Sequence, residues 1–207
     1  MNDQRTPITT WAIIAVPILY YLALIGGALT YPGYSHVTRY ASELGAADAP
    51  YPGLFNYSII AAGFAGMLGG YGLFAGLVRI GGLPRWAAMA GLSLALWGAA
   101  MVVGGSFPMP DDRHGAYGLG LAGQLTPLLT LLAIRRLPDA GGFRLLLAAV
   151  FLVSTGLLAV MMGVGELVTT RNVGLWQRAY SGASIAWLAL LGLWLQHRLR
   201  ERRRVAG

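Results

Sequence analysis

The sequence predicts an all-α fold: a polytopic membrane protein in which one six-helix transmembrane domain covers residues 1–207. Charged residues make up only 11% of the chain and hydrophobic residues 56%, whereas soluble domains carry roughly 25% charged residues. Apolar runs of about 18 or more residues with few charges are long enough to cross a bilayer. Six such runs follow one another, so most of the protein surface is predicted to face lipid.

Each predicted span has its own signals. The first apolar run is too long for the core of a signal peptide, and no small-residue cleavage site follows it. The second carries the glycine pairs Gly66/Gly70 and Gly72/Gly76, which allow helices to approach closely in lipid. These pairs serve either internal packing or a dimer, so the oligomeric state stays open. Pro127 predicts a bend in the fourth span. The predicted spans cover residues 8–29, 54–78, 86–103, 116–134, 145–164 and 176–195.

The connection between the first two spans predicts a short amphipathic helix over residues 35–44. Gly33 and Gly45 bracket this segment. Its polar residues recur at the spacing of one helix face, and its apolar residues fall on the opposite face. We expect this helix to lie at the membrane interface. The polar face consists of His36, Arg39, Tyr40 and Glu43, and the apolar face of Val37, Ala41 and Leu44.

The arginines predict the orientation. The chain has 15 basic residues and a net charge of +7, which in a soluble protein would suggest nucleic acid. In a membrane protein, basic residues instead gather on the cytoplasmic side, and no nucleic-acid partner is predicted. Four arginines fall on one side: Arg39, Arg113, Arg171 and Arg178. The other eleven are Arg5, Arg79, Arg85, Arg135, Arg136, Arg144, Arg198, Arg200, Arg202, Arg203 and Arg204. Both termini are therefore predicted to be cytoplasmic.

Two residue types are missing from the chain. Without cysteine there are no disulfides, thiolate metal sites or cysteine nucleophiles. Without lysine there is no Schiff-base chemistry on a lysine side chain. We predict no cofactor and no resident metal.

The polar residues of the non-cytoplasmic side form the candidate binding site. Arg178 lies about one turn inside the last span, and an arginine at a helix centre costs about 2.5–3.5 kcal/mol on insertion scales. We therefore expect an acidic partner for it, namely Glu43, Asp111 or Glu166. Glu43 is also expected to pair with Arg39, four residues earlier. The predicted ligand-binding residues are His36, Arg39, Glu43, Asp111, His114 and Arg178.

The break between the third and fourth spans admits two interpretations. Asp111 and Asp112 are expected to cap the start of the fourth helix, where the helix dipole favours negative charge. Alternatively, Asp111 and His114 with His36 form a catalytic metal site that hydrolyses lipid esters or amides. The break lacks a recognised metal-binding spacing such as HExxH, which favours capping. The six tryptophans are predicted mostly to mark the membrane interfaces.

Three blocks resemble one family. They are YPGYSHVTRYASELG at 31–45, Phe107-Pro108 followed by an acidic residue and His114-Gly115, and GLWQR at 174–178. Together they are similar to the DUF998 family, over nearly the whole chain. The resemblance implies a small six-span protein of a prokaryotic inner membrane and supplies no activity. One departure is Gln177, where the family's pattern leads us to expect glutamate before Arg178.

These observations predict a membrane protein whose outer pocket binds an amphipathic or anionic-headgroup ligand, or a protein partner, in addition to membrane lipid. The metal-dependent lipid hydrolase is the alternative, so the sequence leaves open whether the protein is an enzyme. A channel or transporter is less favoured, because no relay of charged residues crosses the middle of the membrane.

Overall fold

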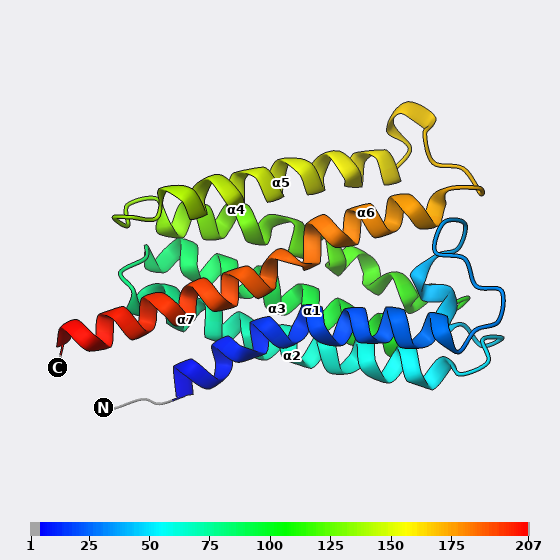
Figure 1. Ribbon diagram of the computed structural model, residues 1–207, viewed down its shortest axis with the longest axis horizontal. Coiled ribbons are helices and arrows are strands. Elements are labelled where there is room, and N and C mark those ends of the chain that lie inside the picture. The colour runs from blue at the N-terminus through cyan, green and yellow to red at the C-terminus, as the bar shows by residue number, and fades with distance from the viewer. Residues whose placement is uncertain (1–4, 207) are drawn as a thin grey trace.

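Six spans lie side by side along the long axis of the computed structural model, which describes residues 5–206 (Figure 1). The described part contains helices and no strand, so the predicted all-α class is confirmed. All six spans are long and apolar enough to cross a membrane, and the chain is a multi-pass membrane protein. Residues 1–4 and 207, which the predicted domain includes, lie outside the described residues.

The helices follow the predicted order, with short 3-10 helices in the loops. The first five spans contain α1 (Arg5–Leu29), α2 (Pro52–Arg79), α3 (Pro84–Ser106), α4 (Ala122–Ile134) and α5 (Gly141–Met161). The last span consists of α6 (Val173–Ile185) and α7 (Trp187–Ala206). The 3-10 helices are η1 (Ala41–Gly45), η2 (Asp112–Leu121) and η3 (Val164–Glu166).

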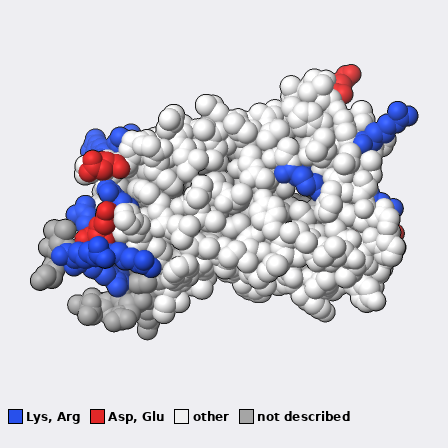
Figure 2. Space-filling view, in the orientation of Figure 1, with Lys and Arg blue, Asp and Glu red and all other residues white. Residues whose placement is uncertain are grey.

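The two ends of the bundle differ in their connections. The first and last described residues lie at one end, together with the short turns 80–83 and 135–140 (Figure 1). Here Arg198 donates to the Pro138 carbonyl and Arg202 to the Ile80 carbonyl, each at 2.9 Å. We call this the arginine-rich end, and the opposite one, with the connections 30–51, 107–121 and 162–172, the loop end. Charged side chains gather at both ends, and the surface between them is mostly uncharged (Figure 2).

The glycines of α2 let its backbone touch neighbouring helices. A Cβ on Gly70 would lie 2.4 Å from the Gly91 carbonyl oxygen of α3. A Cβ on Gly72 would lie 2.5 Å from the Thr9 carbonyl oxygen of α1. On the same side of α2, Gly76 leaves room for the Leu195 side chain of α7. Both predicted glycine pairs are therefore used for packing within a single chain.

Hydrogen bonds between helices join the spans. The hydroxyls of Ser93 and Thr126 lie 2.8 Å apart and link α3 to α4. Gln124 donates to the Ser154 and Thr155 hydroxyls of α5, both at 2.8 Å. Such bonds between spans contribute about 0.6 kcal/mol each on average. They fix which faces of α3, α4 and α5 meet.

The predicted α-helix over residues 35–44 is wrong, because only Ala41–Gly45 is helical, as the 3-10 helix η1. A regular helix would join the Ala41 amide to the Val37 carbonyl. Instead, the Ala41 amide donates to Gln177 Oε1 at 2.6 Å, and the Val37 carbonyl accepts from the Leu175 amide at 3.0 Å. Residues at the start of α6 thus bind both the amide and the carbonyl that a regular helix would join to each other. The loop also lies so close to α6 that a Cβ on Gly174 would be 2.5 Å from the Arg39 carbonyl oxygen.

Two spans are less regular than predicted. The residues Ala116, Tyr117 and Gly118 have positive φ angles of 47°, 52° and 79°, so the fourth span opens as η2 and becomes α-helical only at Ala122. The last span breaks at Ala186, where Trp187 Nε1 donates to the Ser184 carbonyl at 2.9 Å. Trp187 is buried in the bundle, so the interfacial position predicted for most tryptophans is wrong for this one.

Candidate functional site

A cavity of about 250 Å³ extends from the loop end toward the middle of the bundle. Its lining includes residues from Leu94 to Gly105 on α3, a distance of roughly 16 Å at 1.5 Å per residue. Aromatic and aliphatic side chains form most of the wall, among them Tyr20, Phe55, Leu94, Trp97, Ile185 and Trp187. The polar lining residues are Ser42, His114, Gln124, Thr126, Gln177, Tyr180, Ser181 and Ser184. Among residues 5–206, no Asp, Glu, Arg or Lys belongs to the lining.

Helical spacing places these side chains on the cavity wall. On α6, Gln177, Ser181 and Ser184 recur at intervals of four and three residues and therefore share one face. On α3, Trp97 and Met101 follow the same rule. The Trp97 ring lies directly against Gly123 of α4, where a Cβ would be 2.6 Å from the ring. Small residues on one helix thus make room for large rings on the next.

His114 has a defined tautomer in this wall. Its Nδ1 lies 3.0 Å from the carbonyl oxygens of both Gly104 and Phe107. A carbonyl oxygen only accepts hydrogen bonds, so Nδ1 carries the proton that is shared between them. In the neutral imidazole, Nε2 is then a hydrogen-bond acceptor. The turn between α3 and η2 thereby fixes the ring at the outer end of the cavity.

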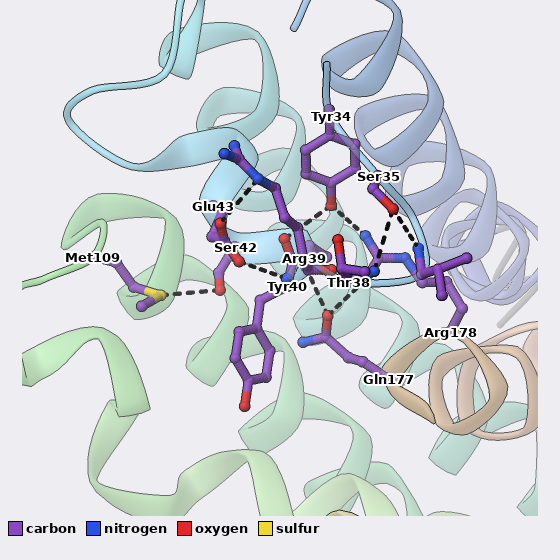
Figure 3. Close-up of polar contacts among 12 residues, drawn as sticks. Tyr34, Ser35, Thr38, Arg39, Tyr40, Ser42, Glu43, Met109, Gln177 and Arg178 are labelled. Carbon is purple, nitrogen blue, oxygen red and sulfur yellow. Dashed lines mark hydrogen bonds and ion pairs between the residues drawn. The ribbon is translucent and has the colours of Figure 1, made fainter. Parts of the chain in front are cut away.

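Arg178, next to the cavity residue Gln177, holds the loop rather than an acidic group (Figure 3). Its Nη1 donates to the Arg39 carbonyl at 2.6 Å and to the Gly174 carbonyl at 3.2 Å. Its Nη2 donates to the Tyr34 hydroxyl. Among the described residues it makes no ion pair with Glu43, Asp111 or Glu166, so the predicted acidic partner is wrong. Backbone carbonyls can replace a carboxylate here because they carry the negative end of the peptide dipole.

The orientation of the Gln177 amide follows from its neighbours. Oε1 accepts from the Ala41 amide at 2.6 Å and from Arg178 Nη1 at 3.2 Å (Figure 3). Both neighbours are donors, so the oxygen must face them. The Nε2 amide group is left without a hydrogen-bond acceptor among the described residues. An oxygen at residue 177 is sufficient for these contacts, so glutamine can replace the glutamate that the resemblance led us to expect.

Arg39 and Glu43 form the predicted ion pair, with 3.8 Å between Nε and Oε2. Glu43 Oε1 also accepts from the Tyr40 amide at 2.7 Å. The Arg39 guanidinium lies 5.1 Å from the centre of the Tyr31 ring. A separate groove is lined by Tyr31, Arg39 and Glu43, together with Asp48 and Met109. The pair stabilises the loop around η1 and lies outside the cavity wall.

Asp111 is held by a neighbouring arginine. Its carboxylate accepts from Arg113 Nε at 2.9 Å and Nη2 at 2.7 Å. These bonds and a further one from the Arg113 backbone amide lower the pKa of Asp111 to about 2. The hydrogen bond from the Arg113 backbone amide to the Asp111 carboxylate caps η2. The predicted capping role of Asp111 is therefore confirmed, although the capped helix is a 3-10 helix.

His36 is exposed, and its ring packs edge-on against Tyr34 with 5.3 Å between ring centres. Partial desolvation lowers the pKa of His36, and the positive charge of Arg178 lowers it further. Across residues 5–206, no group of three His, Asp or Glu side chains is arranged to hold a metal ion. The ligand set of the alternative hydrolase, His36 with Asp111 and His114, is therefore not assembled.

Of the six predicted site residues, only His114 lines the cavity. Arg178, Arg39 and Glu43 build the loop at its outer end, while Asp111 and His36 lie elsewhere on the loop end. Three lining residues were not predicted from the sequence, namely Gln177, Ser181 and Ser184. Their signal was present as a polar stripe at helical spacing inside an apolar span. It was overlooked because uncharged residues in a span are usually helix–helix contacts.

Comparison with known proteins identifies one match. The sequence profile described as "Protein of unknown function (DUF998)" matches residues 13–194. Neither the curated proteins nor the solved structures gave a match to the chain.

Proposed function

The chain belongs to the DUF998 family, and from the geometry of its cavity we propose that it binds an amphipathic ligand within a prokaryotic cytoplasmic membrane. The observation that carries this proposal is the cavity lining. Ligand sites are mostly apolar and aromatic with a few convergent polar groups. Here Leu94 and Leu188 belong to the apolar inner part of the cavity, whereas His114 and Gln177 lie at its outer end.

The loop at the cavity mouth supports the proposal. Ala41 and Ser42 of η1 are part of the lining, so this segment covers the outer end of the site. Arg178 and Gln177 fasten it to α6 through the Arg39 carbonyl and the Ala41 amide. In this proposal the charged residues predicted from sequence shape the cover, and the uncharged residues of α3, α4 and α6 contact the ligand. Membrane lipid is the natural source of such a ligand.

Native mass spectrometry of the purified protein tests the proposal. Ser184→Phe and, separately, Met101→Phe each add a ring to the cavity wall. Ala179→Phe is the matched control, because Ala179 lies on α6 but is exposed and outside the lining. We expect a small amphiphile to co-purify with the wild type and with Ala179→Phe, and to be lost from both cavity-filling variants. Equal retention in all four proteins would contradict the proposal.

The proposed orientation places the arginine-rich end in the cytoplasm, as the positive-inside rule requires. The chain has no cysteine, so single cysteines can be introduced without background. We expect Asp48→Cys, at the loop end, to react with a membrane-impermeant maleimide in intact spheroplasts. We expect Asp139→Cys, at the arginine-rich end, to react only after permeabilisation. The reverse pattern would overturn the orientation and leave the fold unaffected.

A further inference from the structure

We infer that the ligand's head is uncharged and carries a hydroxyl or amide group that bridges His114 and Gln177. This inference rests on the proposed function and names the chemical class of the ligand. It differs from the anionic headgroup expected from the sequence.

The charged side chains nearest the cavity are turned away from it. Arg178 follows Gln177 directly, yet only Gln177 is in the lining. The guanidinium of Arg178 contacts the loop carbonyl of Arg39, and Glu43 contacts Arg39 and the Tyr40 amide. A charged head in the cavity would therefore be taken out of water without a charged partner. Burying an unpaired charge is far more costly than burying a hydroxyl or amide that finds hydrogen bonds.

At the outer end of the cavity, His114 offers an acceptor and Gln177 offers a donor. His114 Nδ1 is committed to two carbonyl oxygens, which leaves Nε2 as an acceptor in the neutral imidazole. Gln177 Oε1 is committed to Ala41 and Arg178, which leaves the Nε2 amide hydrogens as donors. A hydroxyl or a primary or secondary amide can donate to His114 and accept from Gln177. A carboxylate only accepts, and would set its negative charge against the Nε2 lone pair of a neutral His114.

The deeper polar groups are already satisfied by the protein. Gln124 donates to Ser154 and Thr155, and Thr126 is hydrogen-bonded to Ser93. The inner part of the cavity therefore presents mainly the apolar side chains of Leu94, Ile185, Trp187 and their neighbours. An alkyl chain fits this surface, so the expected ligand is a neutral single-chain amphiphile such as a monoacylglycerol, a fatty alcohol or a fatty amide.

Two probes that share one chain but differ in head charge test the inference. Monodecanoylglycerol is neutral, whereas decanoate is a carboxylate at about pH 8. Binding is measured as the shift that each probe causes in the thermal unfolding midpoint of the full chain in nanodiscs. The shift of Ser184→Phe is subtracted from the shift of the wild type. This difference removes effects of probe dissolved in the bilayer. We expect the glyceride to raise the wild-type midpoint at concentrations about tenfold lower than decanoate requires, and neither probe to affect Ser184→Phe specifically.

His114→Asn tests the proposed contact. The asparagine amide can still donate toward the Gly104 and Phe107 carbonyls, but the Nε2 acceptor is lost. We expect this variant to keep its unfolding midpoint without probe and to bind the glyceride about tenfold more weakly, while Ala179→Phe binds it like the wild type. Unchanged glyceride affinity in His114→Asn would overturn the inference.

The outcomes separate the inference from the proposed function. If decanoate binds as tightly as the glyceride and Ser184→Phe abolishes both, the cavity is a ligand site but its ligand need not be neutral. In that case the inference fails and the proposed function stands. If neither probe distinguishes the wild type from Ser184→Phe, and native mass spectrometry shows no retained amphiphile, both fail.

Discussion

Replacing Gly70 by alanine is expected to destabilise the bundle by about 2–4 kcal/mol, or to prevent its accumulation in the membrane. The new Cβ would lie 2.4 Å from the Gly91 carbonyl oxygen, and the contact is mutual, because a Cβ on Gly91 would lie 2.5 Å from the Gly70 carbonyl oxygen. Neither atom is the end of a flexible side chain, so α2 and α3 must separate along their length. The thermal unfolding midpoint in detergent measures the effect.

Gly156→Ala is the matched control for this substitution. Gly156 is an exposed glycine inside α5, and a Cβ there would meet nothing within 4 Å. Alanine favours a helix interior over glycine by about 0.5–1 kcal/mol, so the control should be neutral or slightly stabilising. If both variants unfolded at the same temperature, the close contact between α2 and α3 would not be a determinant of stability.

The second large effect is expected from Arg178→Ala. This substitution removes the hydrogen bonds to the Arg39 and Gly174 carbonyls and to the Tyr34 hydroxyl. Hydrogen bonds from charged groups contribute about 1.5–3 kcal/mol each, and the abandoned acceptors stay partly buried. We expect a loss of about 2–4 kcal/mol. Because the bonds join residues 34–39 to α6, amide hydrogen exchange over residues 31–45 should increase more than exchange in α2.

Two further variants define the role of this arginine. Arg171 is exposed at the loop end, so Arg171→Ala should change stability by no more than about 0.5 kcal/mol. Arg178→Lys keeps the charge but loses the planar fork that reaches several acceptors at once, and should recover only part of the stability. Equal unfolding midpoints for Arg178→Ala and Arg171→Ala would show that Arg178 does not hold the loop.

The position of Arg178 shows where sequence reasoning about the site reached its limit. The cost of an arginine in a span correctly predicted that the side chain has partners. The partner type was wrong, because carboxylates are visible in a sequence whereas backbone carbonyls of a distant loop are not. The Arg39 carbonyl becomes available only because residues 35–40 are not a regular helix.

The loop itself illustrates the same limit. The alternation of polar and apolar residues over 35–44 suits an amphipathic helix, and its local signals contain nothing against one. Competition came from residues more than a hundred positions away, where Gln177 and Leu175 of α6 bind the Ala41 amide and the Val37 carbonyl. A local pattern cannot report such competition.

The sequence by itself determined the class, the number and order of the spans and the segregation of arginine to one end. These properties follow from the absence of water in the bilayer, which demands long apolar helices whatever their neighbours are. Only the tertiary structure decided that uncharged groups of α3, α4 and α6 converge on a cavity while the charged groups hold its cover. That arrangement depends on how the helices are rotated against one another, which contacts such as Gly70 with Gly91 and Trp97 with Gly123 establish.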